Sequence, residues 1–172
     1  MAIKKLIILT IIIPGFLLTG CKASRIQVEK VTPTVQTLHS EILDVRNCET
    51  TEDLHQSLYD FQEVQTKIEI HPTATQIGTG NRMEIPKETN SILLHEIKKA
   101  YQPELKEAVI ALKETKIHVP ADKIHMYQIQ WLAKTYHATI SFSLDGEAYE
   151  ASYTYRLEIP QIESSRVMSC TA

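Results

Sequence analysis

The segment 135–157 constrains the fold of this chain more than any other. Polar and apolar residues alternate on both sides of Asp145-Gly146, a dipeptide favoured in two-residue type I′ turns. A strand points successive side chains to opposite faces, so such a turn also fixes which residues oppose one another. The segment therefore predicts an antiparallel hairpin with one apolar face and one polar face. The predicted cross-strand pairs are Leu144 with Glu147, Phe142 with Tyr149, Ile140 with Ala151, Ala138 with Tyr153, and Tyr136 with Tyr155.

The rest of the chain from residue 41 onward reads as further strands around one helical region. Leu93, Ile97 and Tyr101 recur at helical spacing, and Pro103 ends this helix and can open a second one. We expect a mainly β (α+β) fold: an antiparallel sheet or a two-layer β-sandwich with one or two short helices around residues 90–113. Strands are expected at 42–48, 59–70, 117–119, 127–131 and 162–170, with a hairpin across 75–85 that turns at 78–81.

Aromatic residues gather on the apolar face of the predicted hairpin. A tyrosine-lined sheet can bind glycans or peptides, or it can form a core whose hydroxyl groups reach the rim. We expect a core, because these strands have no other strongly apolar face. The residues concerned are Tyr136, Phe142, Tyr149, Tyr153 and Tyr155.

The first 20 residues have the composition of a targeting segment. Lys4 and Lys5 precede 13 uncharged residues, 6–18. A membrane-spanning helix needs about 20 apolar residues, so this run is too short to span but fits the apolar region of a signal peptide. A buried N-terminal helix and an ordinary cleaved signal are the alternatives.

The end of this segment, Leu18-Thr19-Gly20-Cys21, resembles the lipobox of bacterial lipoproteins: an aliphatic residue, a small residue, Gly or Ala, then Cys. The resemblance implies a signal peptide at 1–20, cleavage between Gly20 and Cys21, and diacylglyceryl transfer to the Cys21 thiol. Fatty acyl chains such as palmitate would then anchor the protein in a bacterial membrane. Lys22 replaces the Asp that commonly retains lipoproteins in the inner membrane, which favours the outer membrane, facing the periplasm or the surface.

The predicted mature chain divides into two parts. Residues 21–40 are polar and aperiodic after the acylated cysteine, so we expect a flexible tether. Residues 41–172 are expected to form a single β-rich domain. Cys48 and Cys170 remain as an even pair in an oxidising compartment, which predicts a disulfide; a catalytic thiol at Cys48 or two free thiols are the alternatives.

Charge and motifs exclude several function classes. The chain has 18 basic and 21 acidic residues; loss of Lys4 and Lys5 with the leader leaves 16 against 21, a net charge of −5. This balance argues against nucleic acid as a partner. We find no nucleophile elbow, phosphate loop or HExxH motif, and we expect neither catalysis nor a cofactor. His118, His125 and His137 could form a three-nitrogen zinc site, but their spacing matches known sites weakly, so we expect no metal.

The main functional hypothesis is therefore a lipid-anchored envelope lipoprotein whose β-rich domain binds or scaffolds another envelope protein or a glycan. One alternative is an envelope hydrolase with a spatially assembled site. A second is an inhibitor or immunity-type lipoprotein that contacts its target through loop 49–55 (ETTEDLH) or loop 77–82 (IGTGNR).

Overall fold

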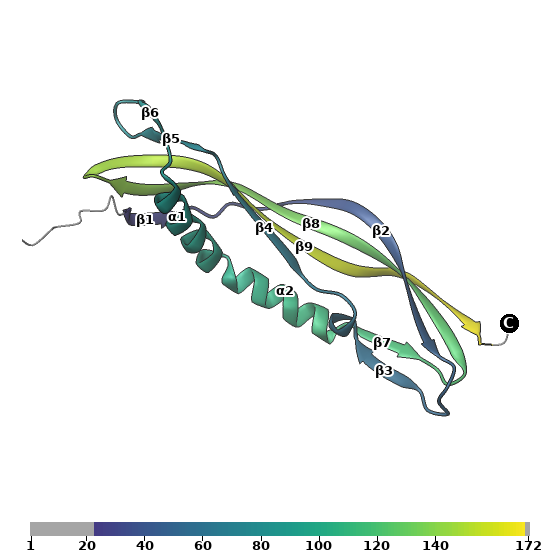
Figure 1. Cartoon of the computed structure of the whole chain (residues 1–172). Helices are drawn as coiled ribbons and strands as arrows, with labels where there is room; N and C mark the ends of the chain where they lie inside the picture. The colour runs from purple at the N-terminus through teal and green to yellow at the C-terminus, as the bar shows by residue number, and fades with distance from the viewer. Residues whose placement is uncertain (1–22, 171–172) are drawn as a thin grey trace, which may run out of the picture.

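The computed structural model describes residues 23–170 and has a mainly β fold with two helices (Figure 1). Gly20, Cys21 and the predicted signal peptide lie outside the described residues. The elements are β1 (Ser24–Val28), β2 (Thr34–Asn47), β3 (Leu54–Ser57), the 3₁₀ helix η1 (Leu58–Asp60), β4 (Gln65–Ile70), β5 (Thr73–Gln76), β6 (Arg82–Glu84), α1 (Lys87–Ala100), α2 (Gln102–Glu114), β7 (Lys116–Val119), β8 (Lys123–Leu144) and β9 (Glu147–Ser169).

The hairpin of β8 and β9 runs the length of the molecule. Asp145 and Gly146 make its turn with φ values of 53° and 88°, and all five predicted cross-strand pairs are confirmed. The two strands contain 22 and 23 residues. The segments 127–131 and 162–170, which the sequence indicated as separate strands, are continuations of this hairpin.

Every other strand of the main sheet pairs with the hairpin except β6, which pairs with β5. The seven-stranded sheet has the order β1-β8-β9-β5-β6, with β2 also paired to β8 and β4 also paired to β9, and all pairs are antiparallel. A second sheet contains only β3 and β7. Figure 1 shows an elongated molecule with α1, α2 and the β3–β7 pair following one another along one side of the long sheet. Of the two predicted architectures, the antiparallel sheet with helices is therefore the one observed.

The two halves of the hairpin bury opposite faces. On β8 the odd-numbered residues from Tyr127 to Ala133 are buried, whereas from Tyr136 to Leu144 the even-numbered ones are buried. The pairing of β8 with β9 is unshifted over 133–144, so this change is a change of face and not a bulge. The twist of the sheet, visible in Figure 1, turns these two opposite faces toward the same side of the molecule. The helices and the β3–β7 pair cover them there in one line.

Two cores result. The proximal core lies at the end that carries β1 and the Asp145–Gly146 turn, and α1 covers it with Leu93 and Ile97. The distal core lies at the opposite end, where η1, the end of α2 and β7 cover Trp131 and its neighbours. Its buried members are Val45, Leu58, Leu112, Ile117, Val119, Tyr127, Ile129 and Trp131.

The tether predicted for residues 21–40 is wrong over most of its described length. Residues 24–28 and 34–40 lie in β1 and β2, paired with β8. Both strands expose most of their side chains, because they add to the sheet through backbone hydrogen bonds. A polar edge strand shows no apolar alternation, and this made it resemble a linker in the sequence.

The expected strand 59–70 begins later than predicted. Leu58–Asp60 forms η1, whose Leu58 side chain is fully buried, and the strand itself is Gln65–Ile70. The backbone N–H of Ser57 donates to Asp60 Oδ2 at 3.3 Å, a local bond that favours a helical turn. Tyr59 and Phe61 therefore belong to this helical turn and its end, and not to the strand.

The helical region and the short hairpin are confirmed. α1 begins at Lys87, directly after Pro86, and Pro103 lies in the first turn of α2. β5 and β6 flank the predicted turn at 78–81. Across residues 23–170, neither helix has the length and apolar character needed to cross a membrane.

Candidate functional site

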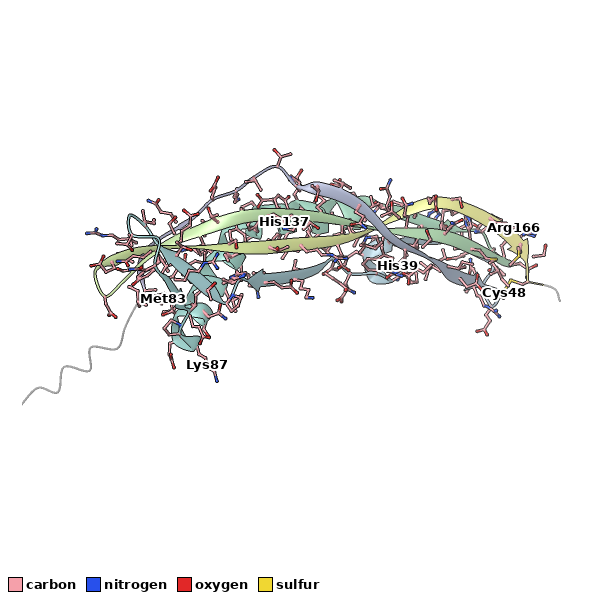
Figure 2. All side chains as sticks on the ribbon, turned by 90° about the horizontal axis from the view of Figure 1, so that it is seen from above. His39, Cys48, Met83, Lys87, His137 and Arg166 are labelled. Atoms are coloured by element: carbon pink, nitrogen blue, oxygen red, sulfur yellow. A yellow bond between two sulfur atoms is a disulfide. The ribbon has the colours of Figure 1, made fainter. Side chains whose placement is uncertain are left out.

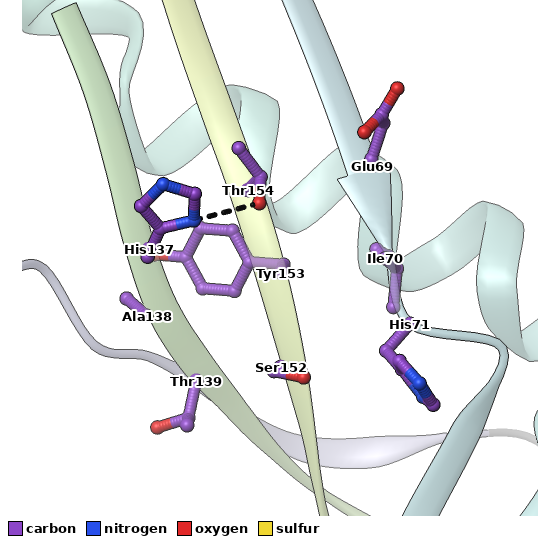
Figure 3. Close-up of a pocket in the computed structure, with 9 residues that line it drawn as sticks. All are labelled: Glu69, Ile70, His71, His137, Ala138, Thr139, Ser152, Tyr153 and Thr154. Carbon is purple, nitrogen blue, oxygen red and sulfur yellow. Dashed lines mark hydrogen bonds between the residues drawn. The ribbon is translucent and has the colours of Figure 1, made fainter.

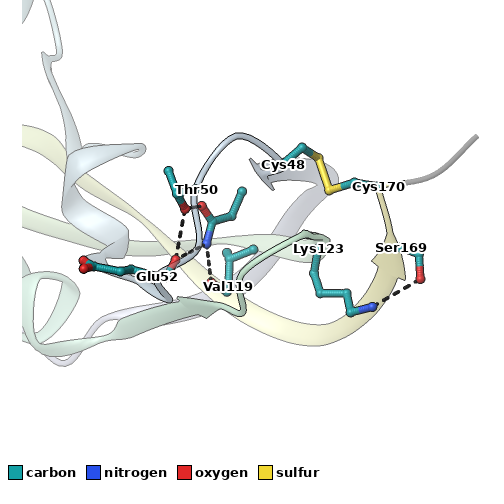
Figure 4. Close-up of a disulfide and its surroundings, with 8 residues drawn as sticks. Cys48, Thr50, Glu52, Val119, Lys123, Ser169 and Cys170 are labelled. Carbon is teal, nitrogen blue, oxygen red and sulfur yellow. Dashed lines mark hydrogen bonds between the residues drawn. A yellow bond between two sulfur atoms is a disulfide. The ribbon is translucent and has the colours of Figure 1, made fainter.

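The distal end of the molecule carries a rigidly held loop. Cys48 and Cys170 form the predicted disulfide, which joins the end of β2 to the end of β9 (Figure 4). The buried Asn47 donates from Nδ2 to the carbonyl oxygens of Glu52 at 2.8 Å and Val119 at 3.1 Å. Loop 49–53 is thus fixed at both of its ends although its side chains are exposed.

Three side chains that can ligate a metal converge beside this loop. β3 pairs with β7 so that His55 lies directly opposite His118. The neighbours of His118 on β7, Ile117 and Val119, are fully buried in the distal core, so strand alternation directs both imidazoles outward. The two rings stack with centroids 4.6 Å apart and an interplanar angle of 6°.

Asp53, just before β3, completes the cluster. Its Oδ2 lies 3.0 Å from His118 Nε2, and its Oδ1 accepts the backbone N–H of Ala121 at 3.0 Å. These bonds, His118 first, lower the pKa of the Asp53 carboxyl group and favour its ionised form. One ligand atom from each of Asp53, His55 and His118 lies within 4.8 Å of the others. A carboxylate and two imidazoles form a donor set suited to a divalent transition metal.

A second layer of contacts supports His118 from beneath. Tyr127 OH donates to the His118 carbonyl oxygen at 2.8 Å, and His125 Nδ1 lies 2.7 Å from the same oxygen. The His118 backbone N–H donates to Tyr127 OH at 3.1 Å. Tyr127 is buried, which raises its pKa. These contacts fix the backbone of β7 on β8 at the position where His118 projects.

The structure does not bring together the three histidines that the sequence analysis considered as a zinc site. His118 and His125 meet only through the His118 backbone, and His137 lies 12 residues beyond His125 on β8, about 40 Å along the strand. His137 Nδ1 instead lies 3.2 Å from Thr154 Oγ1 (Figure 3). Sequence reasoning missed Asp53 and His55 because it did not predict the pairing of β3 with β7. The sequence did carry one signal. Each histidine lies between two residues that face inward in a strand, so its own side chain faces outward.

The polar face of the proximal half is a second exposed surface. A shallow hollow there spans β4, β8 and β9 (Figure 3). Glu69 is paired with Lys67 at 2.6 Å, and this hydrogen bond lowers its pKa. Such a surface offers hydroxyl groups for hydrogen bonding to a polar partner. Its polar lining residues are Glu69, His71, His137, Thr139, Ser152 and Thr154.

The tyrosine-rich face is core, as predicted. Tyr101, which follows α1, inserts against it and stacks on Tyr155 with centroids 4.2 Å apart. Its hydroxyl group lies 2.9 Å from that of Tyr153. Burial raises the pKa of Tyr101 and Tyr153, and raises that of Tyr155 to about 12. These hydroxyl groups are structural, since Tyr101, Tyr153 and Tyr155 are all at most 3% exposed.

Comparisons with known proteins give little to place beside this geometry. No family model matches the chain, and no curated protein matches it. Among solved structures, an aerolysin-like protein of Bombina maxima is similar at 9% sequence identity and a TM-score of 0.31, over 85% of this chain and 97% of that one. A TM-score of this size does not establish a shared fold.

Proposed function

We propose that this protein is a bacterial envelope lipoprotein, acylated at Cys21, whose elongated domain presents binding surfaces to another envelope protein or a glycan. The observation that carries the proposal is the place of Ala23, two residues after the lipobox cysteine. Ala23 is 7% exposed and packs in the proximal core, and Ser24 pairs with Ser143 near the tip of the hairpin. The predicted attachment point thus adjoins one extreme end of a long domain.

This placement supports a defined orientation on the membrane. Only Lys22 separates Cys21 from Ala23, so the chain can extend roughly 7 Å between them. Two or three acyl chains suffice to hold a folded domain on a bilayer. β8 has 22 residues, so the distal end would stand on the order of 70 Å from the lipid surface. Its surfaces would then reach partners well beyond the headgroups, in the periplasm or outside the outer membrane.

The test of the anchor is Cys21→Ser. The variant should move from the membrane fraction to the soluble fraction, because it cannot be acylated, and intact mass should show the loss of the acyl groups. Lys22→Asp is the matched control: it should remain acylated and shift toward the inner membrane. A Cys21→Ser variant that stays in the membrane fraction would refute the lipoprotein proposal.

The second candidate is an inhibitor or immunity-type lipoprotein. The observation that favours it is the acidic distal loop, in which Glu49, Glu52 and Asp53 are exposed while Asn47 and the disulfide hold the backbone. A preordered loop loses little conformational entropy on binding, as suits an inhibitor.

A photo-crosslinking residue at position 52 separates the two candidates. Capture of a structural envelope protein or a glycan favours scaffolding, whereas capture of a secreted or toxic enzyme favours inhibition. The same probe at Ile77, exposed near the opposite end, is the control. The hydrolase alternative receives less support, because Asp53 and His118 are half-exposed and a water-excluded cleft would suit catalysis better.

A further inference from the structure

We propose that Asp53, His55 and His118 together bind one divalent transition-metal ion, of which Zn²⁺ is the type, at the distal end of the molecule. The inference rests on this cluster alone and does not depend on the lipid anchor. Three side chains from two paired strands and the adjoining loop offer one carboxylate oxygen and two imidazole nitrogens, all within 4.8 Å of one another.

The spacing fits first-row metal coordination. Zinc binds nitrogen and oxygen ligands at about 2.0–2.2 Å in tetrahedral sites, so neighbouring ligand atoms lie about 3.3–3.5 Å apart. Asp53 Oδ2 and His118 Nε2 are already 3.0 Å apart. The His55 ring is stacked on that of His118, and its exposed side chain can turn to bring a nitrogen to the same point. Binding would turn the two exposed rings out of their parallel stack, so that one nitrogen of each faces the ion.

The cluster is also held in the way that ligands in metal sites are held. Ala121 N–H binds the Asp53 oxygen that does not face His118, and so orients the carboxylate. Tyr127 and His125 fix the backbone of His118.

A simple Asp53–His118 ion pair accounts for only part of this arrangement. The β3–β7 pairing brings a second imidazole against the first, 4.6 Å away, and an ion pair of Asp53 with His118 leaves this group unused. A metal ion uses all three groups. Imidazole ligands favour zinc, copper or nickel over calcium or magnesium. Three protein ligands leave a fourth tetrahedral position, open at the exposed tip to water or to a donor atom of a partner.

The experiment is an isothermal calorimetric titration of the full protein with ZnCl₂, after EDTA has removed any bound metal ions. One ion per chain should bind, and His55→Gln, His118→Gln and Asp53→Asn should each weaken the affinity at least tenfold. His137→Gln removes an exposed histidine far from the cluster and should leave the affinity unchanged. Affinities that are equal in wild type and in all three cluster variants would overturn the proposal.

A second measurement needs no variant in the cluster. In NMR spectra of the wild-type protein, substoichiometric Zn²⁺ should shift the ring resonances of His55 and His118 and leave that of His137 in place. Resonance changes confined to other histidines, or absence of any change at micromolar zinc, would refute the site. Because this measurement uses the wild-type protein, loss of zinc binding through misfolding of a variant cannot be mistaken for support.

Discussion

At the scale of residues, one buried side-chain amide, that of Asn47, joins the parts of the distal end by hydrogen bonds. Asn47 satisfies two backbone carbonyl groups, one in loop 49–53 and one at the end of β7, and its Oδ1 accepts the hydroxyl of Thr50. Its side chain thereby joins the loop that carries Asp53 to the strand that carries His118. Buried carbonyl groups that lose their donor are costly, so this one residue supports both the loop and the candidate metal ligands.

Asn47→Ala should lower the free energy of unfolding by about 1–3 kcal/mol, because the carbonyls of Glu52 and Val119 lose their donor. Asn47→Asp should lower the free energy of unfolding further at neutral pH, because a negatively charged carboxylate would then face the same two carbonyl oxygens. Urea unfolding measures both. Asn81→Ala, in an exposed turn, is the control and should change stability by less than about 0.5 kcal/mol. A neutral Asn47→Ala would show that the loop does not depend on this residue.

The disulfide makes a larger contribution through the unfolded state. Cys48 and Cys170 are separated by 122 residues, and closing a loop of this length restricts the unfolded chain strongly. Cys48→Ser should therefore lower the free energy of unfolding by about 2–5 kcal/mol. Urea unfolding of the variant, beside wild type with and without reductant, measures this. If reductant leaves the wild-type midpoint unchanged, the bridge contributes nothing to stability.

At the scale of elements, the turn between β8 and β9 determines the register of the hairpin from Leu144 to Ile129, beyond which the pairing shifts. Gly146 has a φ of 88°, and a Cβ placed there would meet no atom within 4 Å. A substitution therefore tests backbone conformation without steric contact. Any shift in this turn would also displace every pair of the hairpin, since one residue of slippage exchanges its two faces.

Gly146→Ala should destabilise the protein by about 1–2 kcal/mol, because alanine tolerates this left-handed conformation poorly. Gly146→Asn should cost less, since Asn adopts positive φ more readily. Thermal unfolding of the two variants gives the comparison. Equal melting temperatures for both variants would argue against backbone strain as the cause.

The tyrosine core gives a second prediction at this scale, in alkaline solution. Burial raises the pKa of Tyr155 to about 12, above its ordinary value of 10. A raised folded-state pKa contributes stability that is complete below pH 10 and is lost as pH rises from 10 to 12. Tyrosinate absorbance and circular dichroism should therefore change together in that range. Full tyrosine ionisation with the dichroism unchanged would contradict this linkage.

The sequence revealed those elements whose side chains alternate and concealed those that depend on backbone pairing. The hairpin turn, its register and the helical region follow from local patterns in the chain. β1 and β2 do not, because their side chains are mostly polar and only the backbone of β8 receives them. The candidate metal site was hidden for a related reason: His55 and His118 are 63 residues apart and meet only because β3 pairs with β7.

At the scale of the whole molecule, the long sheet separates two ends, with Cys48 near one and Met83 near the other (Figure 2). A continuous hairpin of 22 and 23 residues extends far beyond the width of an ordinary domain of this size. It places the proximal core next to the proposed anchor and the acidic loop with its histidines at the opposite extreme. A link of only Cys21 and Lys22, followed by a long sheet, would project the distal surface more reliably than a flexible linker of equal contour length.

Small-angle X-ray scattering tests this shape directly. A compact domain of about 150 residues has a radius of gyration of about 15 Å. A sheet built on a 22-residue strand is on the order of 70 Å long, and a rod of that length has a radius of gyration of at least roughly 20 Å. The Cys21→Ser protein, released from the membrane, should give the larger value with a maximum dimension of about 70 Å or more. A value near 15 Å would mean that the hairpin folds back on itself, and the distal loop would then lie close to the lipid surface, where it could not reach a distant partner.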